Sequence, residues 1–102
     1  YFEETDLCTR IRQAGYEVWY TPETSIIHHV EGSFKPGRID RLRIYYTSLF
    51  RYLEKHRGGY RAVKAYLLAK FGIHSLFAER DADCRRRFRA IWLSGLDYPP
   101  HT

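Results

Sequence analysis

The chain has 102 residues, of which 44% are hydrophobic and 17% aromatic. This is the composition of a globular protein, and it excludes an intrinsically disordered chain. No apolar run approaches the roughly 20 residues that a membrane-spanning helix needs. Two distant cysteines, Cys8 and Cys84, show neither metal-ligand spacing nor a disulfide framework. The chain contains no Met, and we expect it to be a piece of a longer protein.

The net charge of +5 is unevenly distributed along the chain. Residues 1–34 hold six acids against two arginines, whereas residues 35–102 hold fifteen Lys or Arg against six acids. An acidic first part is therefore followed by a strongly basic second part. Such asymmetry favours an anionic partner for the second part: a membrane surface, a phosphate-bearing ligand or a nucleic acid.

The first predicted element is a helix over residues 4–14, because apolar residues recur there at helical spacing. Gly15 is placed to end this helix. Asp6 and Arg10 lie four residues apart, so they are spaced to form an ion pair on its surface.

Two short strands are predicted next, over residues 16–20 and 25–30, with a turn at 21–24 between them. A loop over residues 31–37 follows. Because two short strands do not form a stable sheet alone, we expect them to pair with strands outside this chain.

The remainder predicts three helices, from about residue 38 to the Gly58-Gly59 pair, from 60 to 71 and from 79 to 94. Gly72 is expected to end the second of them. The side chains expected to face a core are Ile39, Leu42, Tyr46, Leu49, Phe50, Leu53, Tyr60, Val63, Leu67, Phe71, Cys84, Phe88, Ile91 and Trp92. The predicted class is an α/β fragment that is predominantly helical, divided into residues 1–37 and a helical extension over 38–102.

The residues that could act in catalysis or metal binding lie in the acidic first part. Glu3, Glu4 and Asp6 gather at a helix start, where the helix dipole favours negative charge. A charged carboxylate can act as a general base, and His28 or His29 together with carboxylates can bind a divalent metal. Plain helix capping by the acids and structural roles for the histidines explain the same pattern.

A longer pattern is more specific. The segment from Phe2 to Tyr16, FEETDLCTRIRQAGY, resembles the acidic motif of glycosyltransferase family 2. In that motif an aromatic residue, two acids, a spacer and an Asp precede Leu, an Arg-rich helix and Ala-Gly-aromatic. The similarity continues through VWYTPE and ends in IIHHVEGS at residues 26–33, which is similar to the family's apolar-His-aromatic-x-Gly-Gly-Ser segment. It covers about 34 residues, a third of the chain, and bacterial rhamnosyltransferase-like members are the most similar.

The resemblance implies the C-terminal part of a GT-A domain, a doubly wound α/β fold that binds a nucleotide sugar. It implies an inverting transfer of a sugar from a nucleotide-diphosphate donor to a glycan or lipid-linked acceptor in cell-envelope polysaccharide synthesis. The family uses Mg or Mn, held mainly by residues that precede this segment. We therefore expect the isolated fragment to be inactive.

The same resemblance assigns roles to three acids. Glu4 matches the base that deprotonates the acceptor hydroxyl, although many members have Asp at this position. Glu3 matches a supporting, acceptor-binding acid. Asp6 matches the third acid of the motif, and its alternative role is that of a surface partner for Arg10.

The later segment supplies the remaining predicted site residues. His28 matches a histidine that binds the metal or the diphosphate, whereas His29 points to the opposite face of a strand and is expected to be structural. Gly32 and Ser33 match the diphosphate-binding end of the motif, with Glu31 in place of the family's first glycine.

The basic helices allow three interpretations: solvated surfaces, peripheral contact with an anionic membrane, or nucleic-acid binding, for which no recognised motif is present. We expect no nucleic acid. A cytoplasmic location at the inner face of the plasma membrane fits lipid-linked acceptors, and uncovered apolar faces favour a homo-oligomer. The alternative to an enzyme is a small basic helical module that binds an anionic membrane surface without catalysis.

Overall fold

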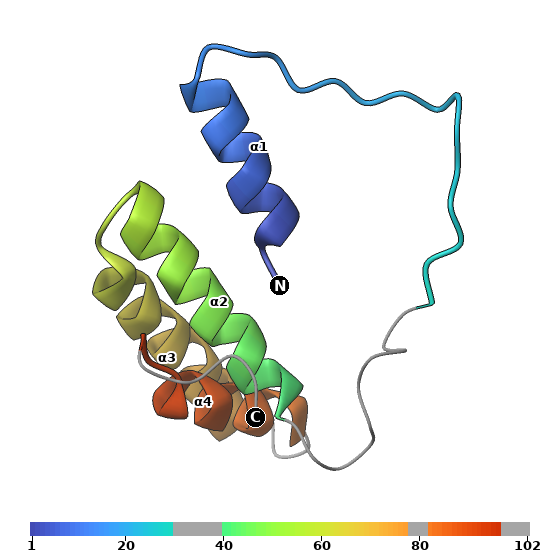
Figure 1. The fold of residues 1–102 in the computed structure, drawn as a ribbon. Coiled ribbons are helices and arrows are strands. Elements are labelled where there is room, and N and C mark those ends of the chain that lie inside the picture. The colour runs from blue at the N-terminus through green and yellow to red at the C-terminus, as the bar shows by residue number, and fades with distance from the viewer. Residues whose placement is uncertain (30–39, 78–81, 97–102) are drawn as a thin grey trace. The chain divides into compact units, whose positions relative to one another are not determined.

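The computed structural model describes residues 1–29, 40–77 and 82–96. These residues form four helices: α1 (Glu3–Gln13), α2 (Arg41–His56), α3 (Tyr60–Phe77) and α4 (Ala82–Leu93) (Figure 1). The chain divides into two units, one over residues 2–39 and one that begins at Asp40 and contains α2, α3 and α4. The prediction of a predominantly helical chain is confirmed.

Helix α1 ends as the sequence predicts. Gly15 has a φ of 89°, a left-handed conformation that glycine adopts without steric cost. Its N–H donates to the carbonyl of Arg12 at 3.0 Å, and the N–H of Tyr16 donates to the carbonyl of Ile11 at 3.1 Å. This pair of hydrogen bonds is the Schellman arrangement, which satisfies the last carbonyls of the helix.

The two predicted strands are not confirmed. Residues 16–29 contain no strand, and residue 30 lies outside the described part. In that segment Trp19, Tyr20 and Ile26 are 82%, 90% and 89% exposed. A strand exists only when a neighbouring backbone accepts its hydrogen bonds, and the described residues offer none. The aromatic and β-branched composition of this segment is therefore not sufficient to build a sheet here.

Helices α2, α3 and α4 pack together around a small core (Figure 1). Phe50 of α2 and Ile91 of α4 are fully buried, with Tyr46 and Ala90 beside them. The predicted inward faces of α2 and α3 are confirmed by the half-buried side chains around this core, namely Leu42, Leu49, Tyr60, Leu67 and Phe71. The apolar stripes of three short helices thus meet in one cluster.

Local residues fix the ends of these helices. The carboxylate of Asp40 accepts a hydrogen bond from the backbone N–H of Arg43 at 3.2 Å, which caps the start of α2. Gly58 and Gly59 have φ values of 68° and 70°, so they make the turn between α2 and α3 as the sequence predicts.

Gly72 does not end α3, which continues to Phe77. A Cβ atom at Gly72 would lie 3.2 Å from the ring of Phe88, so the glycine allows α3 to approach α4 closely. The carbonyl of Gly72 accepts a hydrogen bond from the Ser75 hydroxyl at 2.7 Å. The absence of a side chain here serves helix packing and not helix termination.

Helix α4 lies where the sequence predicts it, but the prediction that Trp92 faces the core is wrong. Cys84 and Ile91 are buried, whereas Trp92 is 65% exposed and Ala90 is buried instead. One residue after Ile91 is a rotation of about 100° around the helix, which turns Trp92 outward. Its ring stacks against half-buried Phe88 at a centroid distance of 6.5 Å.

Replacement of the central core residue tests this packing. Ile91→Ala should lower the free energy of unfolding by about 2–5 kcal/mol and Ile91→Val by about 0.5–1.5 kcal/mol, because each leaves a cavity in proportion to the volume removed. Leu93→Ala, at an exposed position in the same helix, should cost about 1 kcal/mol or less. Urea unfolding followed by far-UV circular dichroism measures all three. Equal losses at positions 91 and 93 would contradict the core described here.

Candidate functional site

The acidic cluster lies at the start of α1. Phe2, just before the helix, has a left-handed φ of 68° and provides no side-chain cap. Glu3, Glu4 and Asp6 occupy the first turn, where unpaired backbone N–H groups and the helix dipole favour negative charge. The predicted arrangement of three carboxylates at one helix end is therefore present.

Two of these carboxylates have partners within the chain. The Arg10 guanidinium bonds to Asp6 at 3.0 Å between Nε and Oδ2, so the predicted ion pair forms. The pKa of the Glu3 carboxyl is lowered, first by a hydrogen bond with the amino group of Tyr1 and then by the backbone N–H of Glu3. The Glu3 contact uses the free amino group of the first residue of this chain, whereas the Asp6 contact is formed by two side chains of α1.

Glu4 differs from its neighbours. Its side chain is exposed, and within the described part of the chain it makes no hydrogen bond or ion pair. A general base must reach the proton that it abstracts, and the exposed side chain of Glu4 is accessible from solvent. Of the three acids, Glu4 is the one for which the described residues supply no partner.

The histidines are not assembled into a metal site. His28 and His29 are both exposed. Across residues 1–29, 40–77 and 82–96, no group of three or more His, Cys, Asp or Glu side chains is positioned to hold a metal ion. Gly32 and Ser33, the predicted diphosphate-binding residues, lie outside the described residues. The structure therefore shows the acidic cluster but not its association with His28.

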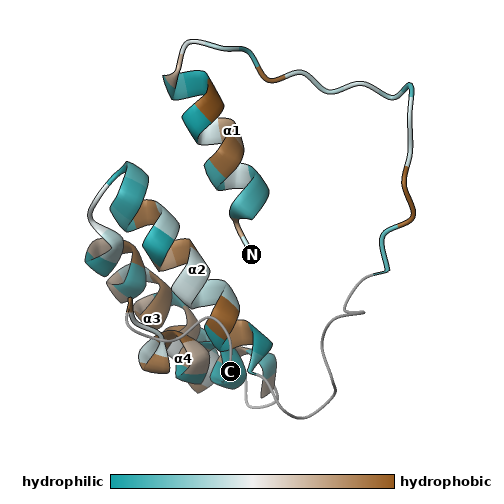
Figure 2. Cartoon of the chain, viewed as in Figure 1, coloured by the Kyte–Doolittle hydropathy of each residue, from teal (hydrophilic) through white to brown (hydrophobic). Residues whose placement is uncertain are grey.

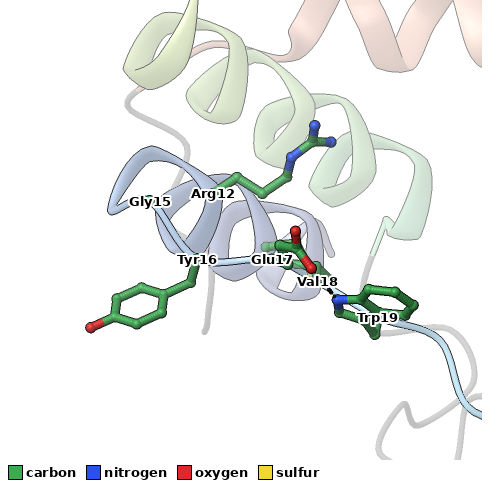
Figure 3. A pocket seen from close by; sticks show the side chains of 7 residues that line it. Arg12, Gly15, Tyr16, Glu17, Val18 and Trp19 are labelled. Atoms are coloured by element: carbon green, nitrogen blue, oxygen red, sulfur yellow. Dashed lines mark hydrogen bonds between the residues drawn. The ribbon is translucent and has the colours of Figure 1, made fainter.

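An open hollow of about 800 Å³ lies where α1 ends, a feature that the sequence did not indicate. Its lining residues are Cys8, Arg12, Gly15, Tyr16, Glu17, Val18 and Trp19. The Trp19 indole donates to the Glu17 carboxylate at 2.6 Å, and Arg12 and Tyr16 point in different directions (Figure 3). Because the polar groups do not converge, the hollow shows no built binding site.

The apolar side of α1 is uncovered within its own unit. None of its residues is buried, and Leu7 is 49% exposed. Figure 2 shows hydrophobic and hydrophilic residues alternating along α1. An amphipathic helix of 11 residues is marginal without tertiary packing, so the acidic cluster needs a further surface to be held firmly.

Two cations of the basic part stabilise the end of α4. Arg51 donates to the carbonyl of Leu96 from Nε and NH2, at 3.0 and 2.8 Å. Lys64 donates from Nζ to the carbonyls of Ser94 and of Trp92, the latter at 3.3 Å. Lys64 thus satisfies carbonyls at the end of α4 that have no partner within the helix, and Arg51 holds the segment that follows the helix.

A third cation, Arg87, is engaged on the side of α4 that faces the core. Its Nε bonds to Asp83 at 2.6 Å, and its guanidinium lies 5.9 Å from the ring centroid of Phe71. The pKa of Arg87 is raised, first by the hydrogen bond with Asp83 and then by one with the Tyr46 hydroxyl. Part of the positive charge therefore has a structural role.

Comparisons with protein-family models, with curated proteins and with solved structures found no match to this chain. Within the described residues, no helix is both long and apolar enough to cross a membrane.

Removal of the Lys64 charge tests the structural role of the engaged cations. Lys64→Met keeps most of the aliphatic stem but loses both hydrogen bonds, so it should lower the free energy of unfolding by about 1.5–3 kcal/mol. Lys70→Met is the matched control, since exposed Lys70 lies on the same helix and, among the described residues, makes no hydrogen bond to a carbonyl, while its Nζ lies 5.8 Å from the ring centroid of Phe71. The measurement is the urea midpoint of each variant. A loss at Lys70 as large as that at Lys64 would show that the carbonyl contacts do not matter.

Proposed function

We propose that this chain carries the acceptor-activating segment of an inverting glycosyltransferase, with Glu4 as the general base. One observation carries the proposal: within a sequence that resembles the family's acidic motif, Glu4 is the exposed carboxylate of the first turn of α1 that has no partner among the described residues. A general base must come within hydrogen-bond reach of the proton that it abstracts, and an exposed carboxylate is open to such an approach.

The proposed reaction transfers a sugar from a nucleotide-diphosphate donor to a hydroxyl of a glycan or lipid-linked acceptor. The Glu4 carboxylate takes the proton of that hydroxyl while the oxygen attacks the anomeric carbon. The bond from this carbon to the diphosphate breaks on the opposite face, so the configuration inverts. The nucleoside diphosphate leaves with the bonding electron pair, and the proton remains on Glu4. The donor site belongs to a part of the enzyme outside this chain.

The other two acids have supporting roles in this proposal. Asp6 is held by Arg10 at 3.0 Å. It lies two residues after Glu4 and therefore on another side of α1, so its proposed role is to order the helix surface around the base. Glu3 adds negative charge next to Glu4, which is suited to hydrogen bonding a second hydroxyl of the acceptor. The cluster thus has one reactive carboxylate and two that position groups around it.

A divalent metal, Mg or Mn, is implied by the resemblance but is not matched by the described residues. No set of three ligands forms among them, and a lone exposed histidine such as His28 supplies at most one. No step of the proposed reaction is therefore assigned to a metal on this chain.

Substitution of the base tests the proposal in the full-length enzyme. Glu4→Gln keeps the shape of the side chain and removes its basicity, so turnover should fall by about 10²–10⁴-fold with little change in substrate binding. Glu4→Asp should retain partial activity, since many members of the family have Asp there. The measurement is the release of nucleoside diphosphate in the presence and absence of acceptor.

Two further variants separate the base from its surroundings. Glu54→Gln removes an exposed acid in α2, outside the segment that resembles the family, and should leave turnover unchanged. Asp6→Asn should lower turnover less than Glu4→Gln. If Glu4→Gln is active and Asp6→Asn is not, Asp6 is the base. If neither variant loses activity, the segment is not the catalytic site of a glycosyltransferase.

A further inference from the structure

The outward side of α4 combines positive charge with an exposed aromatic ring. Its residues, which we call the α4 outer face, are Arg85, Arg86, Arg89, Trp92 and Leu93. All five are exposed, and Trp92 and Leu93 are 65% and 42% accessible. Spacings of three, four and seven residues place them on one side of the helix.

The charge of this face is not neutralised within the described part of the chain. Arg85, Arg86 and Arg89 make no hydrogen bond or ion pair there. Asp83, the acidic residue of α4, is bonded instead to Arg87 at 2.6 Å. Three neighbouring guanidinium groups thus remain able to bind anions.

Helix α3 adds an exposed apolar side. Tyr66, Ile73, Leu76 and Phe77 are 64%, 55%, 80% and 84% accessible, and their spacing places them on one side of the helix. Helix α3 contains no Asp or Glu, and its exposed basic residues are Arg61 and Lys70. Its outward side is therefore apolar with cationic neighbours.

Contacts between the two helices place Trp92 beside α3. Lys64 bonds to the carbonyl of Trp92, and Gly72 lies against Phe88, on whose ring Trp92 stacks. These contacts pair an early α3 position with a late α4 position, so the helices run antiparallel. Trp92 consequently lies near the line where α3 and α4 meet.

We propose that the α4 outer face, together with the exposed apolar side of α3, binds the surface of an anionic lipid bilayer. Arginines pair with lipid phosphates, while tryptophan and other apolar side chains enter the boundary between headgroups and acyl chains. Large apolar side chains that gather on one exposed side of a helix mark an interaction surface, and the lack of acids on α3 favours an anionic one. This inference does not depend on the reaction proposed at Glu4, because none of its residues belongs to α1.

Fluorescence of Trp92 provides a direct test on the full chain. Trp19→Phe leaves Trp92 as the single tryptophan, and vesicles are made of phosphatidylcholine alone or of phosphatidylcholine and phosphatidylglycerol in equal parts. We expect a blue shift of the emission, and quenching by lipids brominated in the acyl chains, with the anionic vesicles only. Added salt should weaken binding, because exposed charges are screened within about 10 Å at 0.1 M.

A pair of double variants locates the contact. Arg85→Gln with Arg89→Gln should weaken binding to anionic vesicles by about 20–30-fold, since each arginine near such a surface contributes about fivefold. Arg12→Gln with Arg57→Gln removes the same charge from exposed positions elsewhere and should change binding much less. Circular dichroism establishes that both variants keep their helices.

Four outcomes would overturn the proposal. Equal binding to neutral and anionic vesicles would show that electrostatic attraction does not drive binding. Equal losses of binding in the two double variants would show that the α4 outer face is not the contact surface. A blue shift that grows with protein concentration without lipid would assign the face to a second copy of the chain. A shift with duplex RNA but not with vesicles would assign it to a nucleic acid. Turnover of a water-soluble acceptor is measured separately, so failure here leaves the proposal for Glu4 standing.

Discussion

The helical unit depends on the burial of two side chains, Phe50 and Ile91, which are fully excluded from solvent. Burying side chains of this size contributes about 1.5–3 kcal/mol each, and it fixes α2 against α4 with α3 packed beside them. The other contacts follow from this placement. Arg51 comes directly after Phe50 and reaches the carbonyl of Leu96 beyond α4, and Lys64 reaches the carbonyl of Trp92, next to Ile91. Hydrogen bonds between residues so far apart in sequence exist because the core brings the helices together.

No comparable burial occurs in residues 2–29. Helix α1 has no buried residue, and Trp19 and Ile26 of the following segment are more than four-fifths exposed. Apolar side chains in this arrangement stabilise a fold only when a further surface covers them. A catalytic domain with a sheet would supply both this cover and the strand partners that the segment lacks, which is consistent with the function proposed for Glu4. The chain thus combines a helical unit that has its own core with a segment whose apolar side chains are uncovered.

Local features of the fold were predictable from the sequence, and non-local ones were not. Helical periodicity located all four helices, and Gly15 and the Gly58-Gly59 pair end helices through their own backbone preferences. Gly72 was misjudged because its role depends on Phe88, sixteen positions later. The strands failed for the same reason, since strand formation depends on a partner backbone. In the site, spacing predicted the Asp6–Arg10 pair, but only coordinates distinguish Glu4 as the unengaged acid, while Gly32 and Ser33 lie outside the described residues.

Amide hydrogen exchange of the 102-residue chain, followed residue by residue by NMR, most directly tests the contrast between the packed helical unit and the uncovered segment before it. We expect the slowest exchange at the amides of Phe50 and Ile91, because they open only when the helical unit unfolds. Amides of residues 17–29 should exchange close to the rate of an unstructured peptide, since none of them donates to a backbone carbonyl within the described residues. If the amides of residues 16–20 and 25–29 were protected from exchange as strongly as that of Phe50, the contrast would be wrong, because the acidic segment would then hold a sheet of its own.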